Sequence, residues 1–338
     1  MPSSIDRLSA FPDDILCHIL SFLPTKTSIS TSILAQRWRF LWAHVPNLNL
    51  GRGKAPKIDT IYNKVMLPYR VKKMNTFRLF SDDAKCCRSQ LTSCIQDAIN
   101  RNVAVLNLSL VIAYTFPSCI FNCKTLVNLK LAGHGDITLM SINDDVYLPS
   151  LKKLFLYSVG YVCEETLPYL LSRCPVLEEL TVHKLEADVA CFVVSSRTIK
   201  RLVLNSYFVI RYYTNNRYTV KIDAPELTYL KFHDYESKDV SCGSLTSLIE
   251  ADVQLDADAD DDDADDDVFD GDAPVEDDVN DVSDDDAHDN DISDDDVLNN
   301  EAPIEGDVLY ARSVLEFVGG LFNVKYLKLS ARWMNVSV

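Results

Sequence analysis

The chain has no apolar segment long enough to cross a membrane. Its longest stretch without a charged residue is 102–123, and those 22 residues include three Asn, two Ser and a Pro, which makes the stretch too polar for a span. Only five residues precede the first charged side chain, and Pro2 stands where N-myristoylation needs glycine. Neither a secretory signal nor that lipid anchor is expected, and we expect a soluble protein that binds no membrane.

Cysteine spacing typical of disulfides or zinc sites is also missing. The ten cysteines are irregularly spaced, and no histidine lies among the five found between 86 and 123. Carboxylates are abundant, but the calcium-loop alignment centred on Gly271 puts Val268 at a ligand position. The histidines are scattered, and none pairs with an evident nucleophile. We expect buried, reduced thiols in an intracellular protein that has no metal, no cofactor and no catalytic residue.

Lysine and arginine are absent from residues 250–307, where 28 of the 58 residues are Asp or Glu. The other 280 residues carry 33 basic and 22 acidic side chains, so a mildly basic globule surrounds an acidic insert although the whole chain has a net charge of −17. Like charge at this density prevents collapse, and we expect 254–307 to be disordered. The insert is either a solubilising loop or a pseudo-substrate that folds back on the basic part. Ser283 and Ser293, each followed by three Asp, are candidate phosphosites.

The sequence does contain a repeat. An apolar pattern of the form L-x-x-L-x-L occurs eight times before the acidic insert, with central residues 22 to 29 apart, and once after it; this spacing is typical of leucine-rich repeats. Each copy predicts a short strand followed by a returning segment, such as a helix over 164–174, and neighbouring strands stack into a parallel sheet. We expect an α/β solenoid with its parallel strands on the concave face, over 47–253, and a final repeat at 308–338. The nine central residues are Leu48, Phe77, Leu106, Leu129, Leu154, Leu180, Leu202, Leu230 and Leu327.

The first 46 residues have a different pattern. Apolar side chains from Ile15 to Leu23 recur at helical spacing and predict a helix between Pro12 and Pro24, and a second helix is predicted over 27–42. Two short helices with wide apolar faces cannot bury both faces by themselves. We expect a partner to cover this surface, including Leu20 and Trp42.

These segments resemble a known family. Four segments of this chain resemble parts of the plant F-box motif: DRL (6–8), FPDDIL (11–16), ILSFLPTK (19–26) and QRWRFLW (36–42). The repeats, including CPVLEEL (174–180), resemble the leucine-rich half of plant F-box/FBD/LRR-repeat proteins. The F-box would cover 4–46. Because family members often continue into an FBD region and this chain stops at Val338, we expect that region to be absent or truncated.

The resemblance implies a substrate-recognition subunit of an SCF ubiquitin ligase, in the cytoplasm, the nucleus or both. The F-box of such a protein docks on a Skp-type adaptor that is bound to a cullin, while the repeats hold a protein target and no nucleic acid. The alternatives are a repeat scaffold that recruits no ligase, and an enzyme, for which no constellation of residues is present. We expect some of the apolar side chains of the F-box to contact the adaptor and the others to form the core of the F-box instead. The candidates are Phe11, Pro12, Ile15, Leu16, Ile19, Leu20, Leu23, Pro24, Leu34, Trp38, Leu41 and Trp42.

A second candidate surface lies on the predicted sheet. Residues that flank the central apolar residue of each strand point to the concave side, and among the nine copies six of them are basic and one is acidic. We expect a positive surface with aromatic anchors, suited to an acidic or phosphorylated target; a merely solvated sheet face is the alternative. The expected target contacts are Arg78, Lys130, Lys153, Phe155, Arg201, Tyr229 and Lys231.

Overall fold

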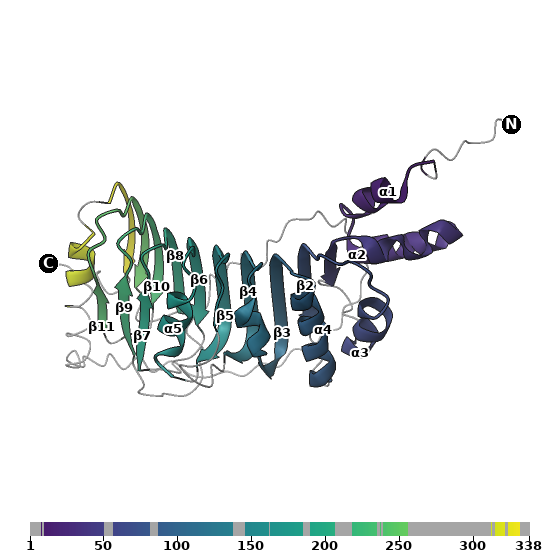
Figure 1. Ribbon diagram of the computed structural model, residues 1–338. Coiled ribbons are helices and arrows are strands. Elements are labelled where there is room, and N and C mark those ends of the chain that lie inside the picture. The colour runs from purple at the N-terminus through teal and green to yellow at the C-terminus, as the bar shows by residue number, and fades with distance from the viewer. Residues whose placement is uncertain are drawn as a thin grey trace, which may run out of the picture.

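The protein forms a long stack of parallel strands, with α1 to α4 at its N-terminal end and α5 beside the middle of the stack (Figure 1). The structure is a computed structural model, which describes residues 8, 10–50, 57–81, 87–137, 146–161, 163–184, 190–206, 218–234, 237, 239–255, 312, 315–321 and 324–331. The predicted disordered insert lies outside the described residues apart from 254 and 255, and so do Ser283 and Ser293. No helix in the described part of the chain is long and apolar enough to cross a membrane.

The N-terminal helical segment, residues 10–46, begins with the predicted helix. Helix α1 (Asp13–Leu20) starts directly after Pro12. Its first turn contains two acidic residues, Asp13 and Asp14, whose negative charges suit the positive end of the helix dipole. The expected second helix over 27–42 is wrong as a single element. It is divided into α2 (Thr25–Ser30) and two 3-10 helices, η1 (Thr31–Ile33) and η2 (Gln36–His44).

Hydroxyl side chains explain this division. Ser30 Oγ donates to Lys26 O at 2.9 Å, and Thr31 Oγ1 donates to Ser28 O at 2.6 Å. Ser and Thr compete in this way with the regular helical hydrogen bonds of the backbone. At Ala35 the chain becomes extended, with φ −161° and ψ 162°, and the apolar residues before and after it face different ways.

In the described part of the chain the main sheet has ten parallel strands, and the predicted repeat is confirmed. All nine predicted central residues lie within its strands. The pairing register places each of the first eight beside the next, and Ala251 lies between Leu230 and Leu327. In sheet order the strands are β1 (Asn47–Leu50), β2 (Thr76–Ser81), β3 (Val105–Thr115), β4 (Asn128–Ile137), β5 (Lys153–Tyr161), β6 (Glu179–Lys184), β8 (Arg201–Ser206), β10 (Tyr229–Asp234), β12 (Glu250–Leu255) and β13 (Tyr326–Ala331).

The tenth strand, β12, was not among the nine predicted copies. It pairs with β10 on one side and with β13 on the other. Its central residue is Ala251, flanked by Glu250 and Asp252, so it resembles the start of the acidic insert more than a leucine-rich strand. Ala251 is nevertheless buried, as the repeat requires of that position.

The returning segments change character along the stack. Helical returns come first: α3 (Ile58–Ile61), the π-helix η3 (Tyr62–Met66), α4 (Arg88–Asn100), the 3-10 helix η4 (Ser118–Asn122) and α5 (Thr166–Ser172). The last of these confirms the helix predicted over 164–174. Beyond it the returns are strands, β7 (Cys191–Ser195), β9 (Thr219–Asp223) and β11 (Asp239–Cys242), which pair in a second parallel sheet. Alternating apolar residues, such as Val220 and Ile222, favour strands there.

The hydrophobic core fills the space between the main sheet and the returning segments. It is continuous from the N-terminal helical segment to the last repeats, because Trp42 and Ala43 belong to the same buried cluster as the repeat leucines. Backbone contacts fix this junction: Arg70 N donates to Ala43 O at 2.9 Å, and Asn49 N donates to Thr25 Oγ1 at 2.7 Å. The helical segment is therefore held on the first repeat by both apolar packing and hydrogen bonds.

A bulge in the sheet depends on one glycine. The register between β3 and β4 shifts after Leu110, and that between β4 and β5 shifts after Ala132. Gly133 lies at this place with a φ of +114°, and a Cβ built on it would lie 1.6 Å from Leu110 O. Only glycine combines this conformation with so close an approach of two backbones.

Candidate functional site

The N-terminal helical segment has its own small core. Leu16, Leu20, Trp38, Leu41 and Val45 are buried against one another. Leu16 and Leu20 are one helical turn apart on α1, so they form one face of the helix. The expectation that Leu20 and Trp42 need a partner to cover them is wrong: Leu20 is shielded inside this core, and Trp42 is shielded by the core of the repeats.

The other apolar residues of this segment remain exposed. Ile15 and Ile19 form a second strip of α1, about 100° around the helix from Leu16 and Leu20, and Leu34, at the end of η1, is 67% exposed. The twelve predicted adaptor contacts are therefore divided between interior and surface. Seven of them are exposed: Phe11, Pro12, Ile15, Ile19, Leu23, Pro24 and Leu34. The other five are buried: Leu16, Leu20, Trp38, Leu41 and Trp42.

Four further exposed apolar residues were not among the predicted contacts: Leu8, Phe22, Ile33 and Phe40, with Ile33 87% exposed. A continuous helix over 27–42 would align Leu34 with Trp38, whereas the break at Ala35 leaves Ile33 and Leu34 outside the core. The run of Ser and Thr before Ile33 was the signal for that break. We call the exposed apolar residues between 8 and 40 the F-box-end surface.

An ion pair holds the F-box-end surface together. Arg37, at the start of η2, lies 2.7 Å from Asp13 Oδ1 and donates a second hydrogen bond to Phe11 O at 2.6 Å. These contacts link residues more than twenty positions apart in the sequence. They place the beginning of η2 beside the beginning of α1, at the end of the molecule where the purple helices lie in Figure 1.

The second candidate surface is the outer sheet face, which comprises the side chains at the first, third and fifth positions of the main strands. The register aligns them in rows, one of which runs Lys130, Phe155, Thr181, Val203 and Lys231. The side chains between them, such as Leu180 and Leu202, are buried in the core. This alternation confirms that the predicted target contacts share one face of the sheet.

The charge of the outer sheet face differs from the prediction. The expected single acidic residue, Glu179, is joined by Glu250 and Asp252 from the unpredicted strand β12. Asp252 Oδ1 lies 3.8 Å from Lys328 Nζ, and Glu179 Oε1 lies 2.8 Å from Lys153 Nζ. The positive charge is therefore concentrated away from these two pairs.

Aromatic rings on the outer sheet face lie under cations. Arg201 Cζ is 3.5 Å from the centre of the Tyr229 ring on the neighbouring strand, and Lys130 Nζ is 4.4 Å from the centre of the Phe155 ring. The Phe155 ring is itself 5.3 Å from the ring of His183. Cation–π contacts of this kind fix long basic side chains in place, so these two cations have defined positions above the sheet.

His183 titrates far from its usual range. Burial, together with the smaller effect of the positive charges of Lys231, Lys130 and His233, lowers its pKa from 6.5 to about 4. Burial and Lys231 likewise lower the pKa of His233, against the opposing effect of Asp252. His183 is therefore a neutral imidazole at neutral pH, in a region of positive potential.

This low pKa predicts a pH-dependent stability. Between about pH 6.5 and 4 the unfolded chain binds a proton at His183 that the folded chain does not, so the folded state loses stability as the pH falls through this window. From about pH 7 to 5, we expect the parent to lose roughly 2 kcal/mol more than a His183→Gln variant. Denaturant unfolding of both proteins at each pH measures the difference. His44→Gln, at an exposed position, should keep the parental slope, and parallel profiles for parent and His183→Gln would show that His183 is not the cause.

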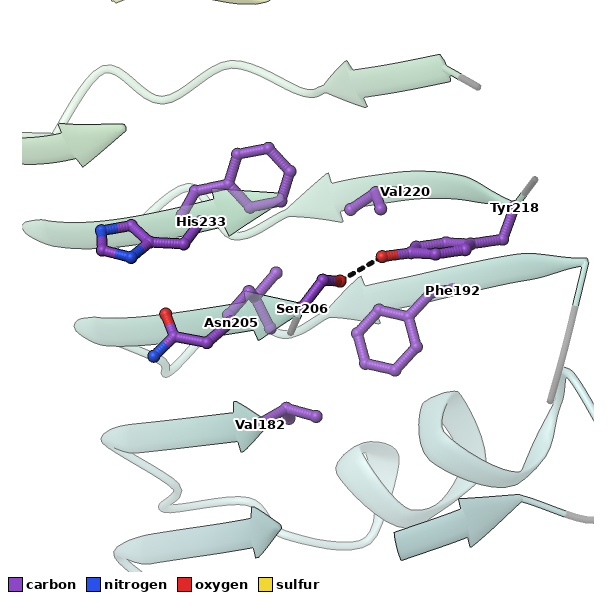
Figure 2. Close-up of a pocket in the computed structure, with 9 residues that line it drawn as sticks. Val182, Phe192, Asn205, Ser206, Tyr218, Val220 and His233 are labelled. Carbon is purple, nitrogen blue, oxygen red and sulfur yellow. Dashed lines mark hydrogen bonds between the residues drawn. The ribbon is translucent and has the colours of Figure 1, made fainter. Parts of the chain in front are cut away.

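A small cavity lies between the two sheets. Its volume is about 20 Å³, enough for about one water molecule. Figure 2 shows Phe192, Tyr218 and Val220 on one side of the main strands and Asn205 and His233 pointing to the other. The cavity is too small for a substrate.

Buried polar groups beside this cavity bind one another. Tyr218 forms a hydrogen bond with Ser206 and donates to Asp234 Oδ1 at 2.9 Å, while Ser237 donates to Asp234 Oδ2. Asp234 is fully buried, and these hydroxyl groups satisfy its carboxylate. We interpret this network as part of the core.

The described cysteines are free thiols. Burial raises the pKa of Cys94 and of Cys174 to about 12, so both thiols stay protonated. In the ranges that the structure describes, no three His, Cys, Asp or Glu side chains are grouped so as to hold a metal ion.

Comparison with known families agrees with this architecture. The F-box domain model matches residues 8–50, which contain the F-box-end surface. A second model, described as the LRR repeats of FBD-associated F-box protein At5g56370, matches residues 90–252, which contain β3 to β11, the first half of β12 and most of the outer sheet face.

Similar proteins are known from Arabidopsis thaliana. F-box/LRR-repeat protein At3g59200 is 36% identical over 267 residues, covering 75% of this chain and 50% of the relative. F-box/LRR-repeat protein At3g59190 is 32% identical over 277 residues, covering 75% and 68%, and F-box/FBD/LRR-repeat protein At5g22700 is 32% identical over 265 residues, covering 74% and 59%.

The chain spans about half the length of the first of these relatives and about two thirds of the second. The helical segment and the repeats from β3 to β11 fall under a matching family model. The chain belongs to the plant F-box/FBD/LRR-repeat protein family, with an N-terminal F-box followed by leucine-rich repeats.

Proposed function

We propose that the protein is the substrate-recognition subunit of an SCF-type ubiquitin ligase. The observation that carries this proposal is the F-box-end surface, where Ile15, Ile19, Ile33 and Leu34 are exposed although the neighbouring Leu16 and Leu20 fill a core. Exposed apolar residues gathered on one part of a protein mark an interaction site. The F-box domain that matches the same residues supports a Skp-type adaptor, and through it a cullin, as the proposed partner.

The proposed mechanism needs no chemistry from this chain. The adaptor holds one end of the molecule, the repeats hold a target, and ubiquitin transfer follows from proximity. The core joins the F-box to the repeats without a flexible linker between Trp42 and β1. Such a connection keeps a bound target at a fixed distance from the adaptor.

The target is proposed to bind the outer sheet face. The predicted contacts lie on this one face of the sheet, and its cations and rings suit a target with acidic or phosphorylated side chains. The contacts proposed are Arg78, Lys130, Lys153, Phe155, Arg201, Tyr229 and Lys231. A protein that joins a Skp-type adaptor in this way works in the cytoplasm, the nucleus or both.

The alternative is a repeat scaffold that binds proteins without recruiting a ligase. Capture of a purified Skp-type adaptor by the full chain distinguishes the two. A stable complex of one chain with one adaptor is expected, and a chain that binds no adaptor while still binding targets would establish the scaffold. Substitutions of Leu16 or Trp38 do not serve this test, because both side chains are buried and their loss would disrupt the F-box itself.

A further inference from the structure

A patch of positive charge lies where the F-box meets the repeats. Residues 57–75, between β1 and β2, contain five Lys or Arg and one acidic side chain. We call Arg39, Arg70, Lys72 and Lys73 the junction basic patch. All four are exposed, and none of them forms an ion pair with a residue that the structure describes. Their charges are therefore available to a partner.

The backbone that carries three of these four residues is fixed by hydrogen bonds. Arg101, at the end of α4, donates from its guanidinium group to Val71 O and, at 3.2 Å, to Tyr69 O. Its Cζ atom also lies 5.5 Å from the centre of the Tyr69 ring. Tyr69 and Val71 are buried, whereas Arg70 and Lys72 alternate with them and are exposed. The basic side chains therefore extend outward from a well-anchored segment.

An exposed aromatic ring connects the patch with the F-box-end surface. Phe40 belongs to that surface, and the centre of its ring is 5.3 Å from Arg39 Cζ and 5.7 Å from Arg70 Cζ. Arg37 and Phe40 are three positions apart on the 3-10 helix η2, so they lie on the same side of it. Since Arg37 binds Asp13 at the start of α1, the apolar surface and the basic patch are continuous.

Cations beside an apolar docking surface limit the charge of what can bind there. The periphery of a protein interface is polar, and opposite charges across it speed association and fix the orientation of the two proteins. A partner that covers Phe40 brings its own surface against Arg39 and Arg70, whose guanidinium groups match carboxylates. Such a partner needs acidic side chains next to its apolar ones.

We propose that the Skp-type adaptor carries an acidic segment that binds the junction basic patch while its apolar surface covers the F-box-end surface. This inference rests on the proposed function, because it names the charge that the adaptor adds to the apolar contact. The contact extends the adaptor's binding site from the F-box to the segment that follows β1. It therefore helps to set the orientation of the repeats relative to the adaptor.

The aromatic residues near the patch favour an acidic protein segment over a nucleic acid. Proteins that bind single strands present exposed rings on which bases stack. Tyr69 is buried, Tyr62 is packed against the core, and two guanidinium groups already lie over the Phe40 ring. Carboxylates of a protein need only the charges.

The test measures the binding of a purified Skp-type adaptor to the full chain by surface plasmon resonance. In about 0.05 M salt, we expect Arg70→Glu and the double variant Lys72→Glu/Lys73→Glu each to lower the association rate constant by about tenfold. In about 0.5 M salt, each variant should come within about twofold of the parent, because salt screens exposed charges.

Arg173 provides the matched control. It is also exposed and lies over a ring, with its Cζ atom 5.2 Å from the centre of the Tyr169 ring, but it follows α5 in the middle of the stack. Arg173→Glu should associate with the adaptor at the parental rate in both salt concentrations. All these variants should unfold at the parental denaturant concentration, because the replaced side chains are exposed.

Parental association rates in both patch variants at low salt would overturn the inference. Carbodiimide cross-linking of the parental complex joins lysines to the carboxylates that they contact. Cross-links from Lys72 or Lys73 to the adaptor are expected, and cross-links to the adaptor only from other lysines would overturn the location. Adaptor capture at a charge-independent rate refutes this inference alone, whereas a parental chain that captures no adaptor refutes the ligase function and this inference with it.

Discussion

Replacing Leu34 with aspartate abolishes the capture of a Skp-type adaptor by the full chain. Leu34 is exposed at the end of η1 and is not part of the F-box core, so the substitution places a charge on the docking surface without opening a cavity. Burying that carboxylate against an apolar partner costs several kcal/mol, and we expect the affinity to fall by at least about a hundredfold. Titration of the purified adaptor by calorimetry measures the loss.

A matched leucine at the other end of the molecule provides the control. Leu315 is also exposed, and it belongs to the segment before β13. Leu315→Asp should bind the adaptor with parental affinity, and both variants should unfold at the parental denaturant concentration. Parental affinity in the Leu34→Asp variant would mean that the adaptor does not dock on the F-box-end surface.

Replacing Gly133 with alanine destabilises the repeats. The added Cβ would lie 1.6 Å from Leu110 O at a φ of +114°, so the strands β3 and β4 must separate or the backbone must leave its conformation. Strain and overpacking together are expected to cost roughly 2–5 kcal/mol of unfolding free energy. Denaturant unfolding followed by circular dichroism measures this loss.

Gly319 is the appropriate control for that substitution. No atom lies within 4 Å of a Cβ built on it, and alanine there adds only helix propensity. Gly319→Ala should therefore match or slightly exceed the parental stability. A Gly133→Ala variant as stable as the parent would show that the bulge between β3 and β4 does not require glycine.

The repeat could be predicted from sequence because its physics is periodic. A central leucine in every strand, such as Leu154 or Leu202, must be buried for the strands to stack, and this leaves a pattern that survives variation elsewhere. Strand β12 departs from the pattern, because Ala251 is small and its neighbours are acidic. The returning strands β7, β9 and β11 were not predicted. The helix α5 was the one returning segment for which the sequence showed a clear apolar pattern.

The division of the F-box between core and surface could not be predicted in the same way. Ile15 and Leu16 are adjacent, equally apolar and both at helical spacing, yet one is exposed and the other is buried. Which of them faces inward depends on where η2 packs against α1. That packing follows from the break at Ala35 and from the Arg37–Asp13 ion pair, neither of which periodicity specifies.

The outer sheet face shows a similar limit for charge. Alternation along each strand predicted which basic residues share the face, but their ion pairs depend on which strands are neighbours. Asp252 lies beside Lys328 because β12 pairs with β13 across the acidic insert, a contact between residues far apart in the sequence. The pairing of strands was therefore needed to find the ion pairs of this face, such as Asp252 with Lys328.

Hydrogen–deuterium exchange of the full chain, with and without a saturating Skp-type adaptor, tests most directly whether the F-box-end surface is the docking site. Protection is expected in α1, α2 and η1, which carry or flank the exposed residues Ile15, Ile19 and Leu34. The strands of the outer sheet face should exchange equally in both states, because they are left for the target. Protection of β4 to β10 by the adaptor, with unchanged exchange in α1 and η1, would contradict the account.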